Sequence, residues 1–244
     1  MTVAAALREH DTLLCDPLLG DHAPASRDEV LARYRRLRAI NQRHHHEILK
    51  LISRDALLHQ ARRLGLARGK TLILDDMDEM HYVYDLAIHT ALPDRSRAID
   101  RYARSVRLAA GSSEAFVLEA MRAAHFAILA IERRHETAGL IATDLVRRAE
   151  VWLVDIGLES SMPDGGIIAT RLYTMGRFSM TAGVNVPLDP GMIQDVLVGL
   201  PRRLGDSPLT TLIDRRSFAE AIYRAALASG IMDRIKYQDL PDDA

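Results

Sequence analysis

The sequence contains a single cysteine, Cys15, and no long apolar run. One cysteine cannot form an internal disulfide, which excludes a disulfide scaffold and favours a reducing compartment. No segment approaches the roughly 18 apolar residues of a membrane span, and the charged N-terminus lacks the apolar stretch of a secretory signal. A formal net charge of −1 over 244 residues gives no strong overall field for nucleic acid or a membrane. We therefore expect a cytoplasmic protein that does not bind membranes.

The first half of the chain has the pattern of a helical region. Ser26, followed by Glu29 three positions later, has the spacing of a capping box that starts a helix. Apolar residues at helical spacing then predict five successive helices, whereas residues 1–25 are expected to be loosely ordered. The expected ranges are Ser26–Ile52, Ser53–Gly65, Asp76–Ala91, Arg95–Leu108 and, after a cap at Ser112 or Ser113, Ala115–Phe126.

In the second half of the chain, apolar residues recur at every second position instead of at helical spacing. From Phe178 to Val186, apolar residues alternate with small polar ones, which is typical of a strand. We predict that Phe178, Met180, Ala182, Val184 and Val186 face one shared core, with Thr181 and Asn185 on the opposite face. Further strands are expected at Gly139–Leu145, Glu150–Asp155 and Gly166–Tyr173. Ser160–Gly166 is interpreted as a hairpin loop, and 128–134 as either a strand or the end of the fifth helix.

Together these elements predict an α+β fold. Four or five short strands joined by short turns favour a small antiparallel meander barrel, SH3-like or similar, because closure removes exposed strand edges. Two helices, at about Met192–Leu204 and Ser217–Ser229, should follow it. The expected division is a loosely ordered segment at 1–25, a helical domain at 26–125, the barrel at 126–188 and C-terminal helices at 189–244.

Two motifs resemble functional sites, but we interpret both as structural features. The stretch Gly65–Thr71 is one residue shorter than a phosphate-binding loop and lacks the strand before it and the helix after it. We interpret it as a helix end followed by a turn, with Thr71–Leu74 extended. The run His44-His45-His46 cannot chelate one ion, because consecutive helical residues point about 100° apart. We interpret it as a polar face of a basic helix.

The predicted third helix carries a narrow polar stripe on an otherwise apolar surface. Asp78, His81, Asp85 and His89 fall within an arc of about 80° on a helical wheel. Such residues suit zinc, iron or manganese, or a general acid–base pair. We favour a solvated seam of exposed side chains and predict no cofactor. If the stripe is a metal site, His125, His44 and Glu47 are the available donors on other helices.

Charge is distributed unevenly along the helical half. Residues 27–68 contain eleven Lys and Arg against four Asp and Glu, whereas residues 75–94 contain six acidic residues and no basic ones. We favour pairing of these segments within the chain or between subunits. A plain solvated surface and nucleic-acid binding are the alternatives. The basic segment has few aromatic residues that could stack on bases, which argues against binding of single strands.

Two regions of the sequence resemble a group of uncharacterised bacterial proteins. The motifs that carry the resemblance are LILDDMDEM at 72–80, YDLAIH at 84–89, VWLVDIG at 151–157, IATRL at 168–172 and FSMTAG at 178–183. The resemblance spans about Ile52 to Pro190 and implies the same layout of helices and barrel. It implies an acidic pair and aliphatic residues on the third helix but not both histidines, which argues against a metal there. It implies no activity.

The sequence therefore predicts a non-catalytic binding or regulatory protein that acts as a homo-oligomer or through a protein partner. The reason is that no nucleophile–base pair, phosphate loop or complete metal motif is present. Small barrels also bind more often than they catalyse. The alternative is a metal-dependent or acid–base enzyme whose site is the stripe of Asp78, His81, Asp85 and His89.

Overall fold

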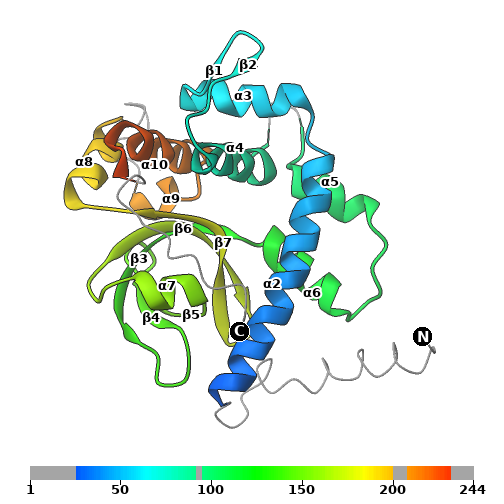
Figure 1. Ribbon diagram of the computed structural model, residues 1–244, viewed down its shortest axis with the longest axis vertical. Coiled ribbons are helices and arrows are strands. Elements are labelled where there is room, and N and C mark those ends of the chain that lie inside the picture. Colours follow the sequence, from blue (N-terminus) through cyan, green and yellow to red (C-terminus); the bar gives the residue numbers. More distant parts are fainter. Residues whose placement is uncertain (1–25, 92–94, 200–207, 232–244) are drawn as a thin grey trace.

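The computed structural model describes residues 26–91, 95–199 and 208–231 (Figure 1). The predictions for Cys15, for the segment 1–25 and for the end of the helix expected to reach Leu204 lie outside these residues. Within the described part of the chain, no helix is both long and apolar enough to cross a bilayer.

The first two predicted helices are confirmed with their caps. Helix α2 spans Arg27–Lys50, and its N-terminus is closed by the capping box, in which the Ser26 side chain accepts from the backbone of Glu29. Helix α3 spans Arg54–Leu64 and is capped by Ser53. It ends at Gly65, whose φ of 83° is a conformation that glycine adopts without steric cost.

The next three helices are present but shorter than predicted. They are α4 (Met77–His89), α5 (Ala98–Ser105) and α6 (Ser113–Arg122). Helix α6 ends early because the first barrel strand starts at His125, so the ambiguous segment 128–134 is a strand. The loop-like motif Gly65–Thr71 forms a small hairpin of β1 (Ala67–Arg68) and β2 (Thr71–Leu72), and not a phosphate-binding loop.

The predicted barrel is confirmed, and five strands close it. They are β3 (His125–Arg134), β4 (Leu140–Asp144), β5 (Ala149–Leu153), β6 (Ile167–Met175) and β7 (Phe178–Pro187). The strand order β3-β4-β5-β7-β6 departs from a simple meander, because β5 pairs with β7 in parallel. Helix α7 (Ile156–Ser161) connects β5 to β6, so part of the expected hairpin loop is helical.

Residues 178–182 of β7 are buried on both faces of the strand, which corrects the prediction for this strand. Phe178, Met180 and Ala182 pack in the cluster with α2, whereas Val186 belongs to a second cluster with α4 and α10, so the core is not shared. Thr181 is fully buried instead of lying on an open face. The reason is closure of the barrel, since its interior covers one face of the strand and helices cover the other.

A bulge in β7 further disturbs the expected alternation. Thr170 of β6 pairs with Asn185 and Leu172 pairs with Thr181, so β7 uses two more residues than β6 over this stretch. Gly183 lies within the bulge with a φ of 110°. Residues with a side chain adopt this conformation only with strain.

Helices surround the barrel on two sides (Figure 1). Helix α2 runs along the barrel and packs against α5 and α6, and α6 also contacts β6. The C-terminal helices α8 (Pro190–Gly199), α9 (Leu209–Leu212) and α10 (Arg216–Ser229) follow β7, and α10 packs against α4. Helices α2 and α4 and strand β7 therefore meet at one place.

Candidate functional site: a polar cleft between α2, α4 and β7

The polar stripe predicted on α4 divides into an exposed end and a buried end. The His81 side chain is 53% exposed, and its Nδ1 lies 3.5 Å from Oδ1 of Asp78. Asp85 and His89, in contrast, are buried. The expectation that all four side chains are solvated is therefore wrong for these two, because α10 and β6 cover this end of the helix.

Asp85 is held by two partners from distant parts of the chain. Arg171 of β6 donates from Nε and Nη2 to its two carboxylate oxygens at 2.9 Å each, and the Tyr223 hydroxyl of α10 donates at 2.8 Å. Burial raises the pKa of Asp85, but Arg171 lowers it more and leaves it at about 2. We call Asp85, Arg171 and Tyr223 the junction, since they join α4, β6 and α10.

The structure does not bring the predicted metal donors together around the stripe, and His125 begins strand β3 instead of lying on a helix. His44 bonds instead to the Tyr102 hydroxyl at 3.0 Å and to the Glu114 carbonyl at 2.9 Å, and Glu47 pairs with Lys50. Among the described residues, no three His, Cys, Asp or Glu side chains form a group that could hold a metal ion. His89 is buried, and burial together with Arg171 lowers its pKa well below the usual value.

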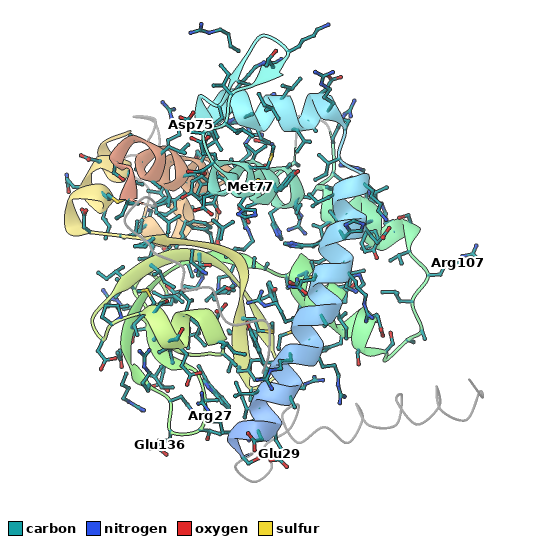
Figure 2. All side chains as sticks on the ribbon, in the orientation of Figure 1. Arg27, Glu29, Asp75, Met77, Arg107 and Glu136 are labelled. Atoms are coloured by element: carbon teal, nitrogen blue, oxygen red, sulfur yellow. The ribbon has the colours of Figure 1, made fainter. Side chains whose placement is uncertain are left out.

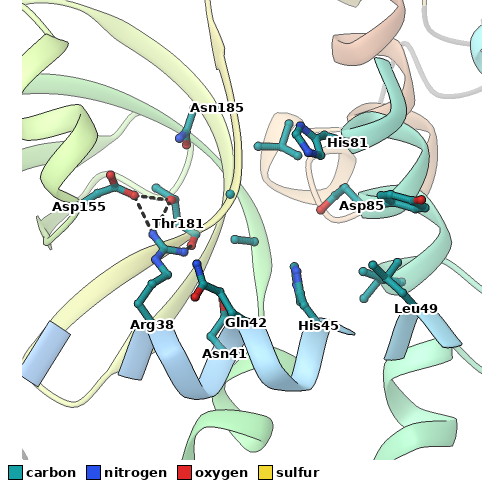
Figure 3. A pocket seen from close by; sticks show the side chains of 15 residues that line it. Arg38, Asn41, Gln42, His45, Leu49, His81, Asp85, Asp155, Thr181 and Asn185 are labelled. Carbon is teal, nitrogen blue, oxygen red and sulfur yellow. Dashed lines mark hydrogen bonds and ion pairs between the residues drawn. The ribbon is translucent and has the colours of Figure 1, made fainter. Parts of the chain in front are cut away.

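A cleft of about 490 Å³ opens beside the junction (Figure 3). Helix α2 contributes Arg38, Asn41 and His45, which lie three to four residues apart and share one face of the helix. Helix α4 contributes His81 and Asp85 from the opposite side, and β7 contributes residues 181–185, which include the bulge. The cleft thus combines residues that are far apart in the sequence.

The three consecutive histidines of α2 have three different environments. His44 is buried against α5 and α6, His45 points into the cleft, and His46 is exposed (Figure 3). The prediction that they cannot act on one ion agrees with these directions. The interpretation as a single polar face is wrong, because a helix presents consecutive residues to different neighbours.

The charged groups of the cleft are already paired. Arg38 donates to the Asp155 carboxylate at 2.8 Å and to the Thr181 carbonyl at 2.7 Å. Asp155 also accepts from the Thr181 hydroxyl at 2.6 Å and caps α7 through the backbone N–H of Leu158. Asp85 is neutralised by Arg171, as described above. Each carboxylate therefore has its own guanidinium.

Three uncharged polar groups of the cleft have no partner within the described protein. They are Asn41 Nδ2, His45 Nε2 and Asn185 Oδ1, which we call the cleft wall. Asn41 is only 2% exposed. Burial lowers the pKa of His45 to about 4, so its imidazole is neutral at pH 7. Buried polar atoms are almost always hydrogen-bonded, so three exceptions that line one cavity make it the candidate functional site.

A model of a protein family matches residues 28–199, which is most of the chain. The chain belongs to the family of unknown function DUF7986. No curated protein and no solved structure matches it. The matched region contains every residue that lines the cleft, whereas Tyr223 of the junction lies beyond it.

The basic segment 27–68 pairs with other elements than the acidic stretch 75–94. Arg27 binds Glu159 at 2.8 Å, Arg38 binds Asp155, and Arg43 binds Glu114 at 3.3 Å. These partners lie on α6, on α7 or just before it. Among the described residues, these ion pairs join the basic segment to α6, α7 and the cap of α7, and not to the acidic stretch as expected. Pairing of the two segments between subunits stays a prediction.

Sequence reasoning identified Asp85 but missed most of the cleft. Arg38, Asn41 and His45 follow helical spacing, and a polar face on a helix that also has an apolar face was the available signal. The alternation in β7 predicts only that Asn185 lies on the face opposite the apolar residues, and does not indicate a cleft there. Arg171 is the one charged residue of β6, and a lone charge in a buried strand is itself a signal for a buried partner.

Proposed function

We propose that this member of the family is a non-catalytic binding protein that holds a small molecule in the cleft between α2, α4 and β7. The observation that carries the proposal is the set of three unpartnered polar atoms in the cleft wall. Leaving a buried donor or acceptor without a partner costs about 1–3 kcal/mol. A ligand that supplies those partners recovers this free energy on binding, which is a reason for a protein to keep such groups.

The state of Asp85 supports binding over acid–base catalysis. A general base needs an accessible lone pair on a carboxylate whose pKa lies near the working pH. Arg171 and Tyr223 occupy both oxygens of Asp85, and its pKa is about 2. The stripe therefore supports the enzymatic alternative poorly.

A cytoplasmic location and a homo-oligomeric state remain part of the proposal. The single cysteine supports the first. Ile73 and Met77 are 51% and 67% exposed, and Met77 is the first residue of α4, beside Asp75 (Figure 2). These exposed apolar residues support an interface with a second copy. Light scattering of the purified protein measures the oligomeric state.

Two adjacent histidines of α2 provide a matched test of the proposed function. We expect His44→Leu to destabilise the protein by about 1–3 kcal/mol, because it removes two buried hydrogen bonds, one to the Tyr102 hydroxyl and one to the Glu114 carbonyl. His45→Leu removes an unpartnered nitrogen from the cleft and should leave stability unchanged or raise it. Urea unfolding at pH 7 measures both. Equal losses for the two variants would mean that His45 has a structural role and would contradict the proposal.

A further inference from the structure

We infer that the ligand of the cleft is uncharged and carries a hydrogen-bond donor beside an acceptor on an apolar body. A carboxamide on an aromatic ring has this chemistry, and so does the edge of a nucleobase. The inference rests on the proposed function, since it names the class of molecule that the same cleft binds.

The first step concerns charge. Arg38 commits four of its five N–H groups, to the Tyr34 hydroxyl, the Asp155 carboxylate, the Thr181 hydroxyl and the Thr181 carbonyl. Asp85 is neutralised by Arg171. A charged ligand would lose its hydration and find no free counter-charge in the cleft, which is unfavourable.

The second step concerns hydrogen bonding. Asn41 Nδ2 can only donate and Asn185 Oδ1 can only accept, so a ligand that satisfies both must present one acceptor and one donor. His45 Nε2 can do either in the neutral imidazole, according to its tautomer. An anion offers acceptors alone, and an ammonium offers donors alone, so neither satisfies the whole cleft wall.

The third step concerns shape. Leu49 and Ile88 on the helices, with Ala182 and Val184 on β7, line the same cleft as the polar groups. The volume of about 490 Å³ is within the range of about 300–1,000 Å³ that small-molecule sites occupy. Gly183 adds no side chain to the wall, and a Cβ built there would meet no atom within 4 Å, so the cleft is open at this point.

Three probes of nearly equal shape separate the effect of charge from that of size. Benzamide is neutral, benzoate is an anion and benzamidine is a cation at pH 7.5. We expect NMR titration of the full chain to give shifts at the cleft residues, with Kd for benzamide at least tenfold lower than for either charged probe.

Substitutions of Asn41 test the assigned donor. Asn41→Leu should weaken benzamide binding at least tenfold, because it removes the amide without removing the apolar walls. Asn41→Asp adds a carboxylate of nearly the same size and should reverse the preference towards benzamidine. If Asn41→Asp does not fold, the loss in Asn41→Leu still decides the point. His46→Gln, on the exposed side of α2, should bind benzamide as the original protein does.

The outcomes distinguish the inference from the proposed function. Binding of benzoate or benzamidine at the cleft as tightly as benzamide would overturn the inference and leave the binding function standing. Unchanged benzamide affinity in Asn41→Leu would overturn the assignment of the donor and with it the inference. If none of the three probes shifts the cleft residues at millimolar concentration, both the inference and the proposed function are wrong.

Discussion

The junction and the cleft wall are two buried polar regions that share the space around α4 and differ in how their groups are satisfied. In the junction, both carboxylate oxygens of Asp85 accept hydrogen bonds from Arg171 or Tyr223. In the cleft wall, Asn41, His45 and Asn185 each leave an atom without a partner. A satisfied network fixes elements relative to one another, whereas an unsatisfied one lowers stability and is available to a ligand. We therefore propose that the junction supports the fold and that the cleft wall binds the ligand.

The largest effect is expected from breaking the junction. Arg171→Met leaves the Asp85 carboxylate buried without its counter-charge, and we expect a loss of about 3–5 kcal/mol of unfolding free energy. Urea unfolding at pH 7 measures this loss.

A double variant serves as the control for that loss. Asp85→Leu combined with Arg171→Met removes both charges, so it should recover most of the stability lost in the single variant. A single variant that loses less than about 1 kcal/mol would show that the junction is not what holds α4, β6 and α10 together.

The junction also shows what sequence can and cannot predict. The 3.6-residue period identified α4 and placed Asp85 on its polar stripe, and the strand composition identified β6. Local patterns do not encode which residue of one element approaches another, so neither Arg171 nor Tyr223 could be assigned to Asp85. The same limit made the stripe look solvated, because a helical wheel does not show what covers each end of a helix.

The cleft wall was harder to predict than the barrel beside it. The period of two located β7 correctly, but alternation predicts one buried and one open face. The closed barrel with helices outside buries both faces over residues 178–182. The bulge at Gly183 then shifts the register, which moves Asn185 relative to Thr181. A lone glycine in an alternating strand was the available signal for that bulge.

The pH dependence of stability provides a second test of the comparison. Burial lowers the folded-state pKa of His45 from 6.5 to about 4. Between these values the unfolded chain binds a proton that the folded chain does not, so stability falls as pH decreases through this window. The slope is about 1.4 kcal/mol per pH unit for one such group.

His45→Gln should therefore reduce the loss of stability between pH 6.5 and pH 4. Urea unfolding at several pH values measures the slope, and His46→Gln is the matched control because His46 is exposed on the same helix. Other buried histidines, such as His89, keep part of the dependence in both variants. An identical slope in His45→Gln and His46→Gln would contradict the burial of His45 in the cleft wall.

The smallest effect is expected at the exposed end of the stripe on α4. His81 lies at the cleft beside Asp78, but its side chain is 53% exposed and the two partners are 3.5 Å apart. Exposed pairs of this kind contribute about 0–1 kcal/mol, so His81→Ala should change the unfolding free energy by less than about 0.5 kcal/mol. The losses of unfolding free energy in His81→Ala and Arg171→Met, measured in the same urea experiment, then compare the exposed and the buried end of the stripe. A loss above about 1 kcal/mol in His81→Ala would mean that the stripe acts as one structural unit, and the division between a supporting junction and a binding cleft would have to be abandoned.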